Sequence, residues 1–468
     1  MTRLTILHTN DVHGRVTQLS RIATLAGRTR REVTANGGHC VLWDAGDIED
    51  PTLFESSMTK GSAAMAMLRG AGYDLAALGN ASIIRYGPQC VRQLAERFGQ
   101  PLLCANMFDA SGQLIEGITP YSIQRFGPCT LAIIGLTDPM AAYSIFKLQP
   151  AEPAQILPQL IAKVRARGAI TIILLSHLGS KRDQDVARQI DGIDLIIGAH
   201  DHVEFDPPIV VNHTLIAQAG DYGRWLGRID LDIDPNTGRI TQHQGKLIPV
   251  SEDIALDLET QAVYQAEQEN VQQLTTQVIG ELRSPIELVY DRQCAAGNLL
   301  ADALLDRIKD AQIALTLSGH WATGLDAGPL TVGALYAANR SAANPARVEL
   351  TGKQIVDFLQ AAFKPENAQR QPKPLRGAPI GLPHIAGMTV YRNEGLLEVR
   401  VGDEPLQLDR TYITAGTDLE FSDIVDYLRV PDDRIEYEAP TIVTEVLEEY
   451  IAAHSPLSAP CGNRVLLK

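Results

Sequence analysis

The sequence has little that would suit a disulfide-built, membrane-spanning or nucleic-acid-binding protein. Its six cysteines are scattered singly and form no CxxC pair, which argues against a disulfide framework and against a thiolate zinc site. It has no run of about 18 apolar residues, so no transmembrane helix is expected. The net charge is −15, and an acidic chain is poorly suited to a nucleic-acid polymer, whose phosphates are neutralised by Lys and Arg.

The first residues also do not have the pattern expected of a secretory leader. Met1 runs almost directly into the strand-like segment at residues 4–7, whereas a leader needs a basic start, a longer apolar stretch and a cleavage site. We therefore expect a cytoplasmic protein, although a periplasmic or extracellular chain trimmed of its leader would look the same. The 468 residues suggest about two or three domains, and the oligomeric state is not indicated.

Residues 1–250 alternate short apolar runs with helical patterns, which is typical of an α/β sheet with helices on its faces. The last part of this region is rich in strand patterns and has no long helical pattern, so we expect a mixed sheet. Strands are expected at residues 4–9, 39–44, 74–78, 102–105, 131–136, 170–175, 193–197, 214–218 and 229–233. Helices are expected at residues 18–34, 61–70, 88–98 and 153–165, among others.

Residues 251–284 differ from their surroundings. They are polar, contain no proline, and carry apolar residues at helical spacing. This pattern predicts a long linking helix, which ends where Ser284 precedes Pro285. Residues 285–468 then form a second domain, with helices expected at 298–309 and 355–363 and a strand at 311–317.

Five of the expected strands end in residue types that bind metals. In chain order these residues are Asp11, His13, Asp47, Asn80, His177, His200 and His202. Each motif alone is more often a turn, a helix cap or a satisfied polar residue. The carboxyl ends of parallel strands meet at one edge of a sheet, where α/β proteins bind ligands. Taken together, the five motifs therefore predict one common site.

Two Asp, one Asn and four His exceed what one tetrahedral zinc requires and suit two divalent ions that share a carboxylate. Oxygen and nitrogen donors without thiolate fit Zn, Mn, Fe, Co or Ni, and the sequence does not choose among them. Such an ion pair polarises a phosphoryl oxygen and makes a water more acidic. Because the ions would be the largest local charges, the acidic chain is compatible with a small phosphorylated substrate.

The order Asp-x-His, Gly-Asp, Gly-Asn, Ser-His and Gly-x-His-x-His resembles the calcineurin-like metallophosphoesterases. The opening Ile-Leu-His-Thr-Asn-Asp-Val-His of residues 6–13 is similar, more narrowly, to their 5′-nucleotidase branch. That branch includes UDP-sugar hydrolases and 2′,3′-cyclic-nucleotide phosphodiesterases. Residues 297–302 and 348–352 also match its C-terminal domain. The resemblance implies an N-terminal four-layer αββα sandwich, a long linking helix and a C-terminal α+β domain that recognises substrate.

The resemblance also implies roles for the predicted ligands. One metal ion would be held by Asp11, His13 and His202. The other would be held by Asn80, His177 and His200. Asp47 would bridge the two ions.

Two departures from the family pattern bear on activity. Ala81 stands where the family has a catalytic histidine, and no acid follows nearby. Losing such a group typically lowers the rate by about 10²–10⁴, so we expect reduced or altered activity that favours good leaving groups. In the second domain, residues 317–322 lack the family's substrate-gripping Arg, which leaves His320 and Tyr427 as candidate substrate residues.

Two other functions remain open. Intact metal ligands without the catalytic histidine also suit a metal-containing protein that binds a phosphorylated ligand without cleaving it. The related sulfur-oxidation thiohydrolases are a third possibility. It ranks last, because nothing in the sequence indicates a carrier-bound sulfur substrate.

Overall fold

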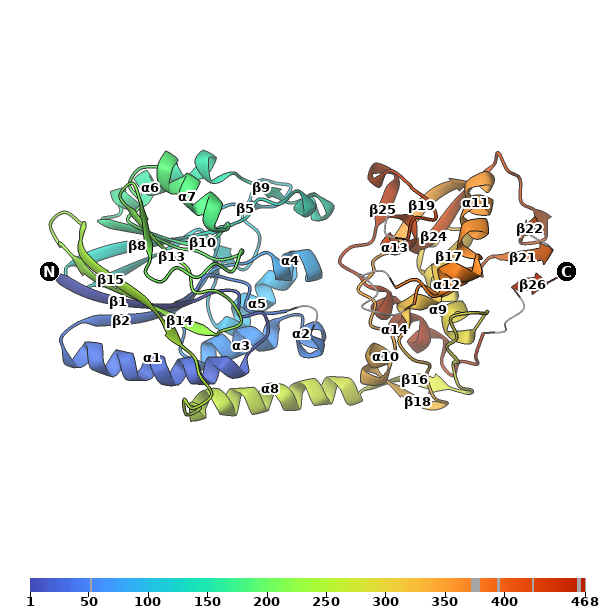
Figure 1. Cartoon of the computed structure of the whole chain (residues 1–468), viewed down its shortest axis with the longest axis horizontal. Helices are drawn as coiled ribbons and strands as arrows, with labels where there is room; N and C mark the ends of the chain where they lie inside the picture. The colour runs from blue at the N-terminus through green and yellow to red at the C-terminus, as the bar shows by residue number, and fades with distance from the viewer. Residues whose placement is uncertain (51–52, 372–378, 394–395, 423–424, 461–463, 468) are drawn as a thin grey trace. The chain divides into compact units, whose positions relative to one another are not determined.

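The computed structural model describes residues 1–50, 53–371, 379–393, 396–422, 425–460 and 464–467. The chain divides into two compact units, Met1–Val271 and Gln272–Lys468. The helix that links them is α8 (Leu258–Thr276), which is coloured yellow-green in Figure 1.

The linking helix is shorter than the predicted span of 251–284. It begins after Asp257, whose side chain accepts the backbone N–H of Thr260 at 2.9 Å, as a helix cap does. It ends at Thr276 because Val278 and Ile279 belong to strand β16 (Val278–Leu282), and β-branched residues favour strands. β16 pairs with β18 (Gly328–Thr331) in the second unit.

The first unit contains two main sheets. The five-stranded sheet has the order β15-β14-β1-β2-β3, in which β1 is parallel to β2 and antiparallel to β14. Its strands are β1 (Thr2–Thr9), β2 (His39–Asp44), β3 (Leu75–Ala76), β14 (Trp225–Ile233) and β15 (Ile240–Pro249). The mixed sheet predicted for this region is therefore present.

The six-stranded sheet has the order β12-β13-β11-β10-β8-β7, and its four central strands are parallel. Its strands are β7 (Tyr121–Phe126), β8 (Cys129–Thr137), β10 (Thr171–His177), β11 (Leu195–Ile197), β12 (Ile209–Val211) and β13 (Thr214–Ala217). The remaining short strands of this unit are β4 (Leu102–Leu103), β5 (Met107–Phe108), β6 (Ile118–Thr119) and β9 (Gln149–Pro150). The strands predicted at 74–78 and 102–105 are thus real but only two residues long.

Strand alternation explains how the layers pack. In β1, Leu4 and Ile6 join the core between the two sheets, whereas Leu7 faces the helices. In β10, Ile173 and Leu175 face the first sheet, and the residues between them face the helices of the second. The first sheet is covered by α1 (Thr17–Ala35), α3 (Ser62–Gly70) and α5 (Cys90–Phe98). The second is covered by α6 (Pro153–Ala166) and α7 (Ser180–Gln189), as Figure 1 shows.

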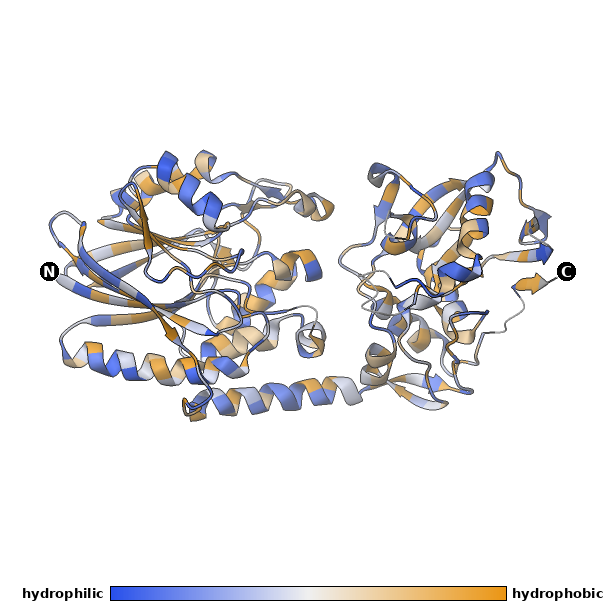
Figure 2. Ribbon diagram, in the orientation of Figure 1, coloured by the Kyte–Doolittle hydropathy of each residue, from blue (hydrophilic) through white to orange (hydrophobic). Residues whose placement is uncertain are grey.

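The predicted four-layer αββα sandwich is therefore confirmed. Figure 2 shows hydrophobic colours along the inner strands of this unit and hydrophilic patches on the outer faces of α6 and α7. Among the described residues, no helix combines the length and the apolar character that crossing a bilayer requires.

The second unit is α+β, as predicted. Its larger sheet has the order β20-β17-β24-β19-β25 and its smaller sheet the order β23-β22-β21-β26. The strands of the larger sheet are β17 (Ile313–Leu317), β19 (Pro345–Thr351), β20 (Pro383–Ala386), β24 (Thr411–Thr417) and β25 (Ile435–Tyr437). Those of the smaller sheet are β21 (Met388–Asn393), β22 (Leu396–Val401), β23 (Glu404–Pro405) and β26 (Val465–Leu467).

Helices pack around these sheets. In the described part of this unit they are α9 (Ala295–Arg307), α10 (Val332–Ala338), α11 (Gly352–Ala362), α12 (Pro365–Ala368), α13 (Asp418–Phe421) and α14 (Val443–His454). Helix α9 begins three residues earlier than predicted, after Cys294. Helix α11 begins with a capping box in which Thr351 accepts the backbone N–H of Gln354. Trp321 is fully buried in the core beside α9 and α14.

Candidate metal centre

The predicted ligands lie in loops that follow strand ends in both sheets of the first unit. Asp11 and His13 follow β1, Asp47 follows β2, and Asn80 immediately precedes α4 (Ala81–Tyr86). His177 ends β10, and His200 and His202 follow β11. Because β1 is parallel to β2 and β10 is parallel to β11, the loops that follow the strands of each pair leave the sheet at the same edge.

Direct contacts bring six of the seven predicted ligands together at this edge. Asp11, His13 and His202 offer ligand atoms within 4.8 Å of one another, and so do Asp11, Asp47 and His177. The ring of His200 lies 5.2 Å from the ring of His177, centroid to centroid. The seventh, Asn80, has a buried Oδ1 that no hydrogen-bond donor among the described residues reaches.

The backbone of the centre is held in an unfavourable conformation. Asp11, His13, Asp47, His200 and His202 all have positive φ, between 47° and 84°. For a non-glycine residue this conformation costs about 1–3 kcal/mol, and it persists only where surrounding structure enforces it. The two loops enforce it on each other: the backbone N–H of Asp11 donates to Gly46 O at 2.9 Å, and that of His13 to Asp47 O at 3.1 Å.

Asp11 is the fully buried centre of the cluster. Its Oδ2 accepts two hydrogen bonds of 2.8 Å, from Asn10 Nδ2 and from the backbone N–H of His200. Its Oδ1 has no hydrogen-bond partner among the described residues and faces Nε2 of His202 at 3.5 Å, of His13 at 3.6 Å and of His177 at 3.9 Å. Burial by itself would raise the pKa of Asp11, but the facing imidazoles of His13 and His202 hold that pKa well below its ordinary range.

Three imidazoles are oriented so that Nε2 points into the centre. Nδ1 of His177 donates to Ala45 O at 2.9 Å, and Nδ1 of His13 donates to Glu49 O at 3.3 Å, because a carbonyl only accepts. Nδ1 of His202 donates to the Asp221 carboxylate at 3.1 Å. Such outer contacts select the tautomer whose Nε2 carries a free lone pair, which is the form that binds a metal.

The inward nitrogens fit a cation. Nε2 of His13 and Nε2 of His202 are 3.1 Å apart, and two facing lone pairs repel unless positive charge lies between them or beside them. Nε2 of His177, Oδ1 of Asp11 and Oδ1 of Asn80 are buried without partners among the described residues. Unpaired buried polar atoms of this kind are rare in folded proteins. Their imidazole, carboxylate and amide chemistry suits divalent ions such as Zn, Mn or Fe.

Asp47 joins the two halves of the centre. Its Oδ1 accepts the backbone N–H of Ala81 at 3.0 Å, and its Oδ2 lies 3.2 Å from Nε2 of His177. Gly79 leaves room for this carboxylate, because a Cβ there would stand 1.9 Å from Asp47 Oδ1. Ala81 is the first residue of α4, half-buried beside Asn80.

Two carboxylates that support the centre were missed at the sequence level. Glu49 is fully buried and accepts the Ser82 hydroxyl at 3.0 Å. Burial raises the pKa of Glu49 to about 8, and the nearby Asp47 charge adds to the effect. Asp221 orients His202. The signals were the position of Glu49 two residues after Asp47 and the Gly-Asp pair that ends in Asp221, both of which resemble ordinary turns.

The two candidate substrate residues lie inside the second unit. The His320 side chain has no exposed surface, and its ring nitrogens contact Ser341 at 2.7 Å and Glu420 at 2.8 Å. Tyr427 is 8% exposed and packs edge-on against Phe358. Both side chains are therefore largely enclosed by protein, and their contact with substrate stays a prediction.

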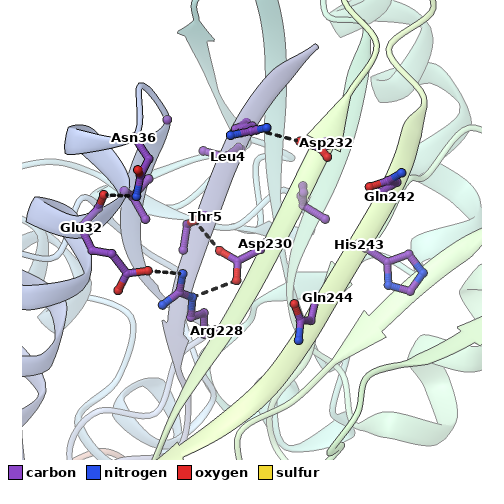
Figure 3. Close-up of a pocket in the computed structure, with 14 residues that line it drawn as sticks. Leu4, Thr5, Glu32, Asn36, Arg228, Asp230, Asp232, Gln242, His243 and Gln244 are labelled. Carbon is purple, nitrogen blue, oxygen red and sulfur yellow. Dashed lines mark hydrogen bonds and ion pairs between the residues drawn. The ribbon is translucent and has the colours of Figure 1, made fainter.

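A polar cavity of about 460 Å³ lies elsewhere in the first unit and contains none of the predicted ligands. Figure 3 shows it between the C-terminal end of α1 and strands β14 and β15. Arg228 there pairs with Asp230 at 2.9 Å and with Glu32 at 3.2 Å. The charges of Arg228, Asp230 and Glu32 therefore compensate one another within the chain.

Comparisons with known proteins identify relatives along nearly the whole chain. Residues 271–424 match the family described as 5′-nucleotidase, C-terminal domain. An uncharacterized metallophosphoesterase, YunD of Bacillus subtilis, is 26% identical over 427 residues, which cover 89% of this chain and 92% of that protein. The 5′-nucleotidase of Vibrio cholerae is 25% identical over 533 aligned positions, covering 99% of this chain and 93% of that protein.

A solved structure has the same fold. The 5′-nucleotidase precursor from Thermus thermophilus superimposes with a TM-score of 0.54 at 22% identity and covers 99% of both chains. The predicted resemblance is thereby confirmed: residues 271–424 match the 5′-nucleotidase C-terminal domain, and the homologues carry the names 5′-nucleotidase and metallophosphoesterase.

Proposed function

We propose that this chain is a two-metal phosphoester hydrolase that acts on nucleotides or related small phosphate esters, with activity reduced or altered because Ala81 replaces the family histidine. The observation that carries the proposal is Asp11 Oδ1, a buried carboxylate oxygen without a donor that faces three imidazole nitrogens at 3.5 to 3.9 Å. The names of the homologues support the same class of reaction.

The proposed ligand assignment keeps the seven predicted residues. Asp11, His13 and His202 would hold one ion, and Asn80, His177 and His200 the other, with Asp47 between them. When bound, the ions would supply positive charge for a phosphoryl oxygen and acidity for a water. The chain's own contribution is orientation: Ala45 and Asp221 aim the imidazoles, and the backbone N–H of Ala81 holds Asp47.

Ala81 limits what the protein can do for the leaving group. A methyl side chain neither donates a proton nor carries charge, so departure of a poor leaving group gets no help at this position. We therefore expect aryl phosphates, pyrophosphates and cyclic diesters to be better substrates than AMP. The test compares turnover of p-nitrophenyl phosphate with that of AMP, and equal or faster hydrolysis of AMP refutes this preference.

The first experiment is metal analysis of the purified protein, followed by a phosphate-release screen with each divalent metal added. The isosteric variant Asp47→Asn should lose bound metal and activity together. Asp230→Asn serves as the matched control, because Asp230 lies on β14 in the separate cavity of Figure 3. Full metal content in Asp47→Asn, or activity that persists in excess chelator, contradicts the proposal.

A second candidate function is favoured by the same alanine. A protein with an intact metal centre and no catalytic histidine would also serve as a receptor that binds a phosphorylated ligand without cleaving it. Calorimetry with a panel of nucleotides distinguishes the two functions. Saturable, metal-dependent binding without phosphate release supports the receptor, whereas turnover with any of the metals supports the hydrolase.

A further inference from the structure

A chain of three hydrogen-bonded side chains lies within the second unit and includes none of the residues assigned to the metal centre. Ser341 contacts Nδ1 of His320 at 2.7 Å, and Nε2 of His320 contacts Oε1 of Glu420 at 2.8 Å. His320 and Glu420 are fully buried, whereas Ser341 is half-buried, so only the serine end of the chain reaches solvent.

The sheet topology brings these residues together. His320 follows β17, Glu420 follows β24 in α13, and Ser341 lies in the loop that precedes β19. β17 is parallel to β24, and β24 is antiparallel to β19. The ends of the first two strands and the start of the third therefore meet at one edge of the sheet, where Figure 1 labels α13 close to β17 and β24.

The surroundings of Glu420 define the protonation of the histidine. Glu420 Oε1 also accepts the backbone N–H of Leu317 at 3.0 Å, and Oε2 accepts the backbone N–H of Thr417 at 3.0 Å. A carboxylate with this many donors is held ionised, so it accepts the Nε2 hydrogen of His320. Nδ1 of His320 is then the bare nitrogen and accepts the hydroxyl proton of Ser341.

We propose that Ser341, His320 and Glu420 form a nucleophile–base–acid triad, which makes the second unit a metal-independent site that cleaves small carboxylic esters. Ser341 Oγ attacks the ester carbonyl carbon while its proton passes to Nδ1 of His320, and Glu420 stabilises the resulting imidazolium. The alcohol leaves with the proton from Nδ1, and Ser341 retains the acyl group as an ester.

Water completes the cycle by the same route. It gives one proton to Nδ1 of His320, its oxygen attacks the acyl carbon, and the carboxylic acid leaves as Ser341 Oγ recovers the proton. The backbone N–H of Ala342 has no acceptor among the described residues and would serve as the donor for the oxyanion. The residue after the nucleophile supplies such a donor in other serine hydrolases.

A structural role for the three residues makes different predictions. Thr417 and Glu420 form the capping box of α13, and the Ser341 hydroxyl accepts the backbone N–H of Ala343 at 3.3 Å. If the chain of contacts served only to hold these loops together, removing the hydroxyl would lower stability, but the native serine would be no more reactive than any other.

The test is covalent labelling of the full chain with diisopropyl fluorophosphate in excess chelator, followed by intact mass and peptide mapping. One adduct is expected, at Ser341, together with hydrolysis of p-nitrophenyl acetate that does not require metal. Ser341→Ala should remove the adduct and lower the ester rate at least about tenfold. Ser284→Ala is the control, because the half-buried Ser284 hydroxyl also accepts a backbone N–H, from Ala459, but contacts no histidine.

Several outcomes overturn the proposal. They are no adduct at Ser341, labelling at Ser341 no faster than at other serines, or an ester rate unchanged in Ser341→Ala. A second variant, Ser341→Cys, keeps the proposal testable if Ser341→Ala fails to fold. The introduced thiol should react with iodoacetamide at least about tenfold faster than Cys40, and a slower reaction refutes an activated position. Asp47→Asn should leave the labelling intact, so failure here and failure of the metal centre are distinguishable.

Discussion

The substitution Gly79→Ala tests whether Asp47 must occupy its observed position for metal to bind. A Cβ at residue 79 would lie 1.9 Å from Asp47 Oδ1, 2.7 Å from its Cγ and 2.5 Å from its backbone nitrogen. Real Cβ contacts are ordinarily about 3.4 Å or longer. The carboxylate must therefore move by more than an ångström, and the loop that carries it by nearly as much.

The magnitude follows from the contacts that this movement breaks. Asp47 Oδ1 would lose the hydrogen bond from the Ala81 backbone N–H, and Oδ2 would leave Nε2 of His177. A hydrogen bond to a charged group is worth about 1.5–3 kcal/mol, which corresponds to about 10- to 100-fold in metal affinity. Overpacking adds about 1–3 kcal/mol of destabilisation to the folded first unit.

The assay is metal stoichiometry after dialysis against a fixed free-metal concentration, together with calorimetric titration and thermal unfolding. Gly27→Ala is the matched control, because Gly27 lies within α1, where an added Cβ meets only the flexible end of Arg31 at 3.6 Å. Gly27→Ala should bind metal normally. Wild-type affinity and stability in Gly79→Ala would show that Asp47 does not hold metal from this position.

Three further predictions use other measurements. Ala81→His should raise AMP hydrolysis by about 10²-fold, the lower end of the usual range, because Ser82 follows it instead of an orienting acid. Ile84→His, on the exposed side of α4, is the control. An unchanged AMP rate in Ala81→His would mean that the loss of the histidine is compensated elsewhere. Removing metal with a chelator should lower the melting temperature. Adding the metal back at 100 times its dissociation constant should restore about 2.7 kcal/mol of unfolding free energy. A melting temperature that does not respond to the chelator argues against bound metal. Burial lowers the pKa of His384 from 6.5 to about 4. Between these two pH values the unfolded chain binds a proton that the folded chain does not. The free energy of unfolding therefore falls as the pH falls, by up to about 1.4 kcal/mol per pH unit. His384→Gln should flatten that slope in hydrogen exchange of α9, and an unchanged slope would assign it to other groups.

Much of the fold could be predicted from the periodicity of apolar residues along the sequence. The strand at 39–44 and the helix at 18–34 carry clear alternating or helical patterns, and both elements are present within a residue or two. The strands at 74–78 and 102–105 shrank to two residues, because apolar content alone does not show where pairing partners end. The predicted linking helix was cut short by β16, whose partner β18 lies about 50 residues further on.

The sequence by itself predicted two domains and the seven candidate ligands, because strand-end motifs and their order are local features of the chain. Only the tertiary structure decided that Glu49 and Asp221 support those ligands. It likewise decided that the buried His320 joins Ser341 and Glu420 in a chain of hydrogen bonds. Contacts such as these join residues 19 to 100 positions apart. They depend on how strands pair and loops cross, which no local pattern of residues encodes.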